Sequence, residues 1–225
     1  MGGRGTSSTI PKPPQPPQPR NFRQFTDADA ANFPKYDINL KNAIKQYARA
    51  DQQASGYSVS QDLNHKLENG LPLNANEQNI VNQINRGQHD IGVDTILHRG
   101  AHADVMAALG VPNYANMTDA QLKAAVVGTQ YQERKLVSTA FDKSKSPFLS
   151  GPMSGGREVV MEISTPSGTK VVYGNPQQAE IVLTGNPTFR VTDASFVRDA
   201  RGNKVMAHPK NGPSAPQVLL KIEIV

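Results

Sequence analysis

The residues best suited to chemistry are Gln178 and Glu180, two positions apart at the start of the apolar run Ile181-Val182-Leu183. Because side chains alternate between the faces of a strand, this spacing predicts that both point the same way, about 7 Å apart, with Ala179 facing into the sheet. An amide and a carboxylate side by side at a loop-to-strand junction could hold a sugar and a nucleophile together. The start of an ordinary solvent-exposed strand could have the same sequence, 178–183. A catalytic role for Gln178 and Glu180 is therefore predicted only together with segments further upstream.

Two upstream segments carry side chains of complementary chemistry. The first is Thr95-Ile96-Leu97-His98-Arg99-Gly100, a β-branched and apolar run that ends in an arginine and a glycine. The second is Leu136-Val137-Ser138-Thr139-Ala140-Phe141, an apolar strand that carries Ser-Thr. A guanidinium makes charge-assisted, often bidentate hydrogen bonds to phosphates. Three segments far apart in the chain therefore supply a cation, a hydroxyl group and a carboxylate.

The elements that must position these residues fall into two groups. Residues 26–130 show apolar side chains at helical spacing, with glycines between the segments, which predicts helices. Within this range, Thr118-Asp119-Ala120-Gln121 has the spacing of a capping box that opens a helix running to about Gln130. Apolar and β-branched runs separated by Gly and Pro turns predict strands. These strands span 94–99, 135–138, 159–164, 170–173, 180–183, 189–196, 204–207 and 218–225. Helices followed by a run of antiparallel strands indicate an α+β fold.

Composition excludes several classes of protein. The chain of 225 residues has no Cys, so it can contain neither a disulfide nor a zinc–thiolate site. No apolar run reaches the roughly 18 residues that a membrane span needs. The net charge of +5 favours anionic partners, but the basic residues are scattered and Trp is absent, so nucleic-acid binding is not predicted.

The first 25 residues differ from the rest. They are rich in Gly, Ser and Thr and then in Pro, which predicts a disordered or polyproline II arm, 1–25, ahead of a single domain, 26–225. The start has no apolar core of a secretory signal, so we expect a non-Sec export route, a virion-associated protein or a cytoplasmic one. Gly2 fits a short myristoylation pattern, and modification there stays open.

A metal site is not predicted. His98 and His102 have the i, i+4 spacing of two zinc ligands on a helix. Arg99 stands where the catalytic Glu of such a motif would be, and Gly100 weakens a helix at this position.

The three segments together resemble the R-S-E class of mono-ADP-ribosyltransferases, the exoenzyme toxin fold that includes C3-like and phage-type members. That class has an aromatic residue or His before Arg-Gly, then Ser-Thr-Ser, then Gly-Thr-Lys followed by (Glu/Gln)-x-Glu. Here these motifs are His98-Arg99-Gly100, Ser138-Thr139-Ala140, Gly168-Thr169-Lys170 and Gln178-Ala179-Glu180. The resemblance covers about 90–225 and implies an N-terminal helical lobe plus a split, two-sheet, mainly antiparallel β-core that binds NAD in its cleft.

The resemblance implies which residues cleave NAD. Breaking the nicotinamide–ribose bond develops positive charge on the sugar, as in glycoside hydrolysis. Glu180 is implied to stabilise that charge and to accept a hydrogen bond from the ribose 2′-hydroxyl. Ser138 is implied to hydrogen-bond Glu180 and to hold its rotamer, and Thr139 continues the same edge. Where the class often has a third Ser, this chain has Ala140.

Further residues are implied to hold the substrate. Arg99 would pair with the NAD phosphates, and Gly100 would let the backbone approach the nicotinamide amide because it has no Cβ. His98 would take the aromatic position beside the cleft. In the loop 141–156, Phe148 would stack on the nicotinamide ring. No metal is implied, and the small-molecule partner is NAD as substrate.

Gln178 implies the kind of acceptor. In the class, Glu at this position accompanies arginine acceptors, whereas Gln occurs in members that modify asparagine and other side chains. An amide offers both a donor and an acceptor to another amide or to a hydroxyl group. The expected function is therefore an NAD-dependent transferase that moves ADP-ribose to a non-arginine side chain of a protein.

Two alternatives remain open from the sequence. An NAD glycohydrolase would use the same Arg99, Ser138 and Glu180 with water as acceptor. A non-catalytic phage or structural interaction module could retain the fold without activity.

Overall fold

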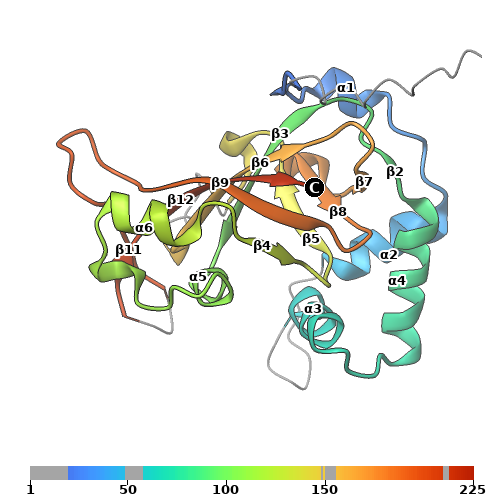
Figure 1. Cartoon of the computed structure of the whole chain (residues 1–225). Coiled ribbons are helices and arrows are strands. Elements are labelled where there is room, and N and C mark those ends of the chain that lie inside the picture. Colours follow the sequence, from blue (N-terminus) through green and yellow to red (C-terminus); the bar gives the residue numbers. More distant parts are fainter. Residues whose placement is uncertain (1–19, 49–57, 148, 150–155, 210–212) are drawn as a thin grey trace, which may run out of the picture.

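We describe a computed structural model of the chain that covers residues 20–48, 58–147, 149, 156–209 and 213–225 (Figure 1). The α-helices are α1 (Asp27–Ala31), α2 (Ile38–Tyr47), α3 (Val59–Asn69), α4 (Ala75–Gly87), α5 (Asp104–Ala108) and α6 (Asp119–Val126). Short 3-10 helices are η1 (Tyr114–Asn116), η2 (Lys143–Lys145) and η4 (Pro176–Gln178). The strands are β1 (Arg23–Gln24), β2 (His89–Asp90), β3 (Thr95–Ala101), β4 (Gln130–Gln132), β5 (Val137–Ala140), β6 (Val159–Thr165), β7 (Lys170–Tyr173), β8 (Glu180–Leu183), β9 (Thr188–Phe196), β10 (Met206–Ala207), β11 (Ala215–Pro216) and β12 (Val218–Ile224).

Local sequence signals explain where the helices begin. Polar side chains at the N-caps of α3, α4 and α6 bind the backbone three residues on, and each helix has a complete capping box. The box predicted at Thr118 and Gln121 is confirmed. The helix it opens is shorter than expected, because α6 ends at Val126 and Gly128, with φ of 88°, turns the chain into a backbone pair with Val191.

One 10-stranded sheet forms the centre of the molecule, in the order β2-β7-β8-β5-β3-β6-β12-β9-β4, with β1 paired to β3. Only β1–β3 and β6–β12 are parallel, so the mainly antiparallel α+β organisation is confirmed. The β-core was expected to be split into two sheets, and the two halves of this sheet correspond to them. The halves join through a single residue pair, His98 and Ala140, between β3 and β5.

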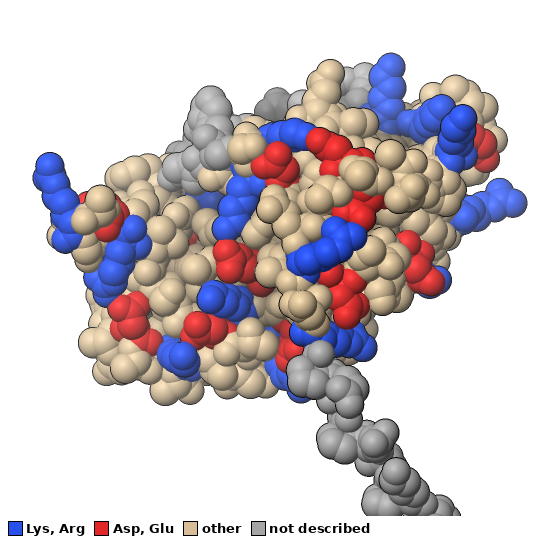
Figure 2. Space-filling view, turned by 90° about the horizontal axis from the view of Figure 1, so that it is seen from above, with Lys and Arg blue, Asp and Glu red and all other residues tan. Residues whose placement is uncertain are grey.

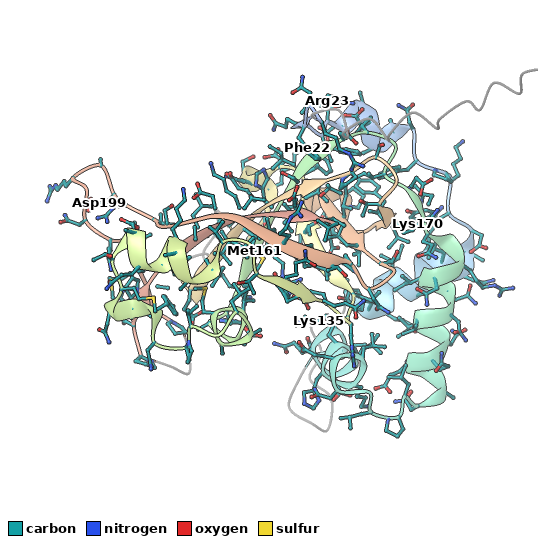
Figure 3. All side chains as sticks on the ribbon, in the orientation of Figure 1. Phe22, Arg23, Lys135, Met161, Lys170 and Asp199 are labelled. Carbon is teal, nitrogen blue, oxygen red and sulfur yellow. The ribbon has the colours of Figure 1, made fainter. Side chains whose placement is uncertain are left out.

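Two cores hold the sheet to the helices. The larger core packs side chains from most strands, with Met161 of β6 near the middle of the sheet (Figure 3). The smaller core packs α2, α3 and α4 against one end of the sheet, where Val172 of β7 and Val182 of β8 face the helices. Figure 1 shows these three helices grouped at that end, with α5 and α6 further along the sheet. The helical lobe therefore reaches the start of β8, where Glu180 lies.

Some strand boundaries differ from the prediction. The strand expected at 135–138 is found at Val137–Ala140, because a side chain of α3 occupies both backbone groups of Leu136 and pairing with β8 starts at Val137. Of the strand expected at 204–207, Met206–Ala207 forms β10, and Lys204 makes only an isolated bridge to Arg198. The two-residue strands β1, β2 and β11 and the three-residue β4 were not predicted.

The expected N-terminal arm lies outside the described residues up to position 19. Its last residues are described: Arg23 and Gln24 pair with β3, and Phe25 is 1% exposed in the larger core. Figure 3 shows Phe22 and Arg23 near the top of the sheet, beside α1. Residues 23–25 are thus part of the folded structure.

Charges are mixed on the described surface. Figure 2 shows Lys and Arg interspersed with Asp and Glu on the face seen from above. No described helix has the length and apolar character to cross a membrane.

Candidate active site

A cleft of about 670 Å³ lies between α2, α3 and the central strands. It brings together seven of the eight residues that the sequence singled out: His98, Arg99, Gly100, Ser138, Thr139, Gln178 and Glu180. The eighth, Phe148, lies outside the described residues. Pockets of this size are typical of small-molecule sites.

Strand register explains the meeting of Ser138 and Glu180. In the β5–β8 pair, Ser138 is opposite Val182 and Ala140 is opposite Glu180. Ser138 and Glu180 are therefore diagonal neighbours on one face, where Val182 faces the helical lobe. The pairing of His98 with Ala140 adds β3 to the same place. The cleft thus opens where the two halves of the sheet join.

Gln178 reaches the cleft by a route that differs from the prediction. It was expected on a strand beside Glu180, but it ends the 3-10 helix η4, and β8 begins only at Glu180. Pro176 starts this helix, the Asn175 side chain caps it, and Ala179 turns the chain with φ of 49°. Ala179 was predicted to face into the sheet, and its side chain is fully buried in the larger core. Gln178 and Glu180 still line the same cleft.

The backbone of the preceding turn holds the Glu180 side chain. Its Oε2 accepts a hydrogen bond from the Asn175 N–H at 2.9 Å. A Cβ added to Gly174 would overlap the same oxygen and lie 2.7 Å from Cδ, so only glycine permits this side-chain position. The expected hydrogen bond between Ser138 and Glu180 does not occur among the described residues; Ser138 interacts with Tyr47 instead.

A buried polar network behind Ser138 was not predicted. The Asn64 amide donates to the Leu136 carbonyl and accepts from the Leu136 N–H, both at 3.1 Å. Asn64 also donates to the Tyr47 hydroxyl group at 3.0 Å. Burial raises the pKa of Tyr47, and hydrogen bonds with Ser138 and Asn64 oppose that shift. Asn64, Tyr47 and Leu136 are remote from one another in sequence. The apolar pattern around Tyr47 and Asn64 predicts only that their helices pack against a core, not that these polar groups meet.

Arg99 has an unused donor in the cleft. Its Nη1 is buried and has no hydrogen-bond partner among the described residues. Buried guanidinium donors are normally satisfied, and an unpaired one needs an explanation such as a ligand. Arg157 and His102 also line the cleft and contact one another, and His102 Nδ1 lies 2.9 Å from the Glu158 carboxylate. Burial and the nearby charge of Arg99 lower the pKa of Arg157. This part of the cleft therefore holds two guanidinium groups, those of Arg99 and Arg157.

His98 is neutral in this environment. Burial lowers its pKa to about 4, and the charge of Lys143 acts in the same direction, against Glu162 and Asp142. Its Nδ1 has no partner among the described residues. Thr139 is engaged within the sheet, because its hydroxyl group donates to the Ile181 carbonyl at 2.6 Å. Gly100 lines the cleft from β3.

Lys135 lies at the edge of the cleft, between the sheet and α3 (Figure 3). Its Nζ is 2.9 Å from Glu68 of α3 and 3.1 Å from Glu133. The pair with Glu68 ties the helical lobe to the segment that leads into β5, the strand that carries Ser138. In the part of the chain that the structure describes, no group of three or more His, Asp or Glu side chains is arranged to hold a metal ion.

Comparisons with known proteins identify the fold. No protein-family model and no curated protein sequence matches the chain. Solved structures do match. A C3-type ADP-ribosyltransferase of Clostridium botulinum is 21% identical, with a TM-score of 0.60 over 91% of this chain and 98% of that one. The C3 exoenzyme of Clostridium limosum is 19% identical, with a TM-score of 0.61 over the same shares.

A third match was solved with NAD. It is a C3 protein of S. aureus, 15% identical, with a TM-score of 0.63 over 92% of this chain and 98% of that one. The agreement covers the helical lobe as well as the sheet, since nearly the whole length of each protein is matched. The chain therefore has the fold of the C3-like ADP-ribosyltransferase exoenzymes.

Proposed function

We propose that this protein is an NAD-dependent mono-ADP-ribosyltransferase that transfers ADP-ribose to a non-arginine protein side chain and releases nicotinamide. One observation carries the proposal: Arg99, Ser138 and Glu180, from three remote segments, line a single cleft together with Gln178. The fold of NAD-dependent transferases and the size of the cleft agree with it.

Glu180 would act on the sugar. As the bond between ribose C1′ and the nicotinamide nitrogen breaks, its electron pair leaves with nicotinamide and positive charge develops on the ribose. A carboxylate fixed beside the ribose favours that charged state over the ground state, which raises the rate of bond cleavage. The backbone contacts at Gly174 and Asn175 hold Glu180 before substrate arrives.

Arg99 would hold the phosphates. Its buried, unpaired Nη1 is suited to a charge-assisted hydrogen bond with a diphosphate oxygen. The guanidinium of Arg157 in the same cleft also favours an anionic ligand, whereas the nearby carboxylate of Glu158 offsets part of that charge. We keep the expectations that Gly100 and His98 lie near the nicotinamide and that Phe148 stacks on it.

Gln178 would orient the acceptor. Its amide can donate to and accept from the side-chain amide or hydroxyl group of a protein substrate. The acceptor nitrogen or oxygen would then form a bond to C1′ in place of nicotinamide and release its proton to water, which completes transfer. No metal takes part in this scheme. Water in place of the acceptor would give NAD hydrolysis at the same site.

The test is incubation of the purified protein with isotope-labelled NAD and bacterial or eukaryotic lysates, followed by mass spectrometry of the modified residue. We expect label on a side chain other than arginine. Gln178→Ala should abolish label transfer and leave nicotinamide release in buffer intact. Label on arginine would contradict the acceptor class. Nicotinamide release without any labelled protein would indicate a glycohydrolase, and no release would indicate a non-catalytic module.

A further inference from the structure

A second hollow of about 600 Å³ lies on the other side of the turn that holds Glu180. Its apolar walls come from α2, from the segment before α2 and from the end of β7: Phe33, Tyr36, Ile44 and Tyr173. The Phe33 and Tyr173 rings meet edge to face at 5.6 Å, and the Tyr36 hydroxyl group accepts from the Tyr173 N–H at 2.6 Å. These contacts fix the walls without closing the hollow.

Three exposed lysines border this hollow: Lys35, Lys41 and Lys45. Within the described ranges, none of these three lysines has an ion-pair partner. Six other lysines do form ion pairs: Lys66, Lys123, Lys135, Lys143, Lys145 and Lys170. Lys41 and Lys45 stand one helical turn apart, an arrangement of like charges that repels. The nearby Asp37 carboxylate is used by the N-terminus of α2, where it accepts from the Leu40 N–H. We call this hollow the lysine-rimmed groove.

The groove shares residues with the candidate active site. Gly174 and Asn175 form part of its wall and also hold the Glu180 carboxylate. Ala48, just after α2, lines both the groove and the cleft. A molecule seated in the groove therefore lies beside the turn that carries Gln178 and Glu180.

We propose that the lysine-rimmed groove docks the acceptor protein, taking an aromatic or aliphatic side chain from a segment flanked by Asp and Glu. The proposal rests on the proposed function, because it assigns the partner of the same site. Apolar walls suit a buried anchor side chain, and unpaired lysines around them select against basic partners. The chain's own arm is a poorer match, because 11–20 carries Lys12 and Arg20 and no acidic residue.

A charge-reversal variant tests the proposal in the full chain. Lys41→Glu/Lys45→Glu changes the groove without touching a residue of the cleft. The matched control is Arg86→Glu/Arg201→Glu, which makes the same change in charge at two exposed positions elsewhere. Each protein is assayed for nicotinamide release in buffer, for label transfer from NAD to lysate proteins, and for peptide binding by fluorescence anisotropy.

The peptide probe is a fluorescein-labelled hexapeptide with Phe-Leu at its centre and two acidic residues on each side. We expect the groove variant to lose at least about tenfold in peptide affinity and in label transfer, because attraction becomes repulsion. Its nicotinamide release should match the wild type, and the control variant should keep all three properties. A probe with Ser-Ser at its centre should bind more weakly.

Three results would overturn the proposal: unchanged label transfer by the groove variant, equal peptide binding by that variant and the wild type, or preferential binding of a basic peptide with the sequence of 11–20. A wild type that releases no nicotinamide would refute the proposed enzyme. Peptide binding would still decide the groove in that case, so the two failures are distinguishable.

Discussion

At the scale of single residues, the position of the Glu180 carboxylate depends on a missing side chain. Gly174 has no positive φ, so its backbone alone does not require glycine, but a Cβ there would overlap Glu180 Oε2 and lie 2.7 Å from Cδ. We therefore expect Gly174→Ala to move the carboxylate and to lower kcat for nicotinamide release by about 10- to 100-fold, the effect of a displacement of about 1 Å.

The matched control for that prediction is Gly168→Ala, because a Cβ at Gly168 meets nothing within 4 Å. Steady-state kinetics with NAD would separate the two variants. Equal kcat values for both would contradict the role assigned to Gly174.

His98 is expected to make stability depend on pH. Its pKa is about 4 in the folded protein and 6.5 in its ordinary state, so the unfolded chain binds more protons between these values. The stabilisation is present above pH 6.5 and is lost as the pH falls toward 4. His98→Gln should flatten the pH dependence of the free energy of unfolding in this window, as measured by urea denaturation. An unchanged slope would show that other groups cause it.

At the scale of elements, the join between α3 and β5 depends on one amide. Asn64 satisfies both backbone groups of Leu136 and the Tyr47 hydroxyl group, and all three are removed from water. Asn64→Ala should therefore lower the free energy of unfolding by about 2 kcal/mol, because the Leu136 N–H loses its partner, while the Leu136 carbonyl still accepts from the Tyr47 hydroxyl group at 3.3 Å. The exposed Asn76 of α4 provides the control, since Asn76→Ala should change stability by less than about 0.5 kcal/mol. Similar losses for the two variants would contradict this account.

The turn before β8 shows why part of the site was predicted incorrectly. Alternation placed Gln178 on a strand, and Pro176 and Asn175 instead start a 3-10 helix that needs Ala179 at positive φ. A buried alanine in that conformation is uncommon, because L-residues other than Gly, Asn and Asp rarely adopt it. Gln178 and Glu180 nevertheless line the same cleft, because both conformations direct them toward the same space.

At the scale of the whole molecule, the N-terminal segment is tied to the sheet by Phe25. This side chain lies in the larger core and contacts the rings of Phe33 and Phe141, at 5.6 and 5.2 Å. Phe25→Ala should cost about 3 to 5 kcal/mol in the free energy of unfolding. Phe22→Ala, at a half-buried position, should cost much less. Denaturation of the two full-length variants would compare them, and equal stability would contradict the assignment of Phe25 to the core.

The sequence predicted the α+β order, most strands and the residues that line the cleft, because periodicity and short motifs are local properties. It could not predict which side chains contact one another when long-range packing brings them together. Tyr47 and Asn64 come from helices whose apolar pattern indicates only a buried face, and Gly174 resembles any turn glycine until Glu180 lies against it. The arm boundary at 25 was placed by composition, which does not register a single buried Phe25.

The central claim is that Arg99, Ser138 and Glu180 form one site that cleaves NAD. Its most direct test is nicotinamide release from NAD by the purified full-length protein and by Glu180→Gln, with NAD affinity measured alongside. We expect release by the wild type and a loss of about 100-fold or more in the variant, with similar affinity, since the carboxylate stabilises charge only near the transition state. Release by Glu180→Gln at the wild-type rate, or no release by the wild type, would contradict the account.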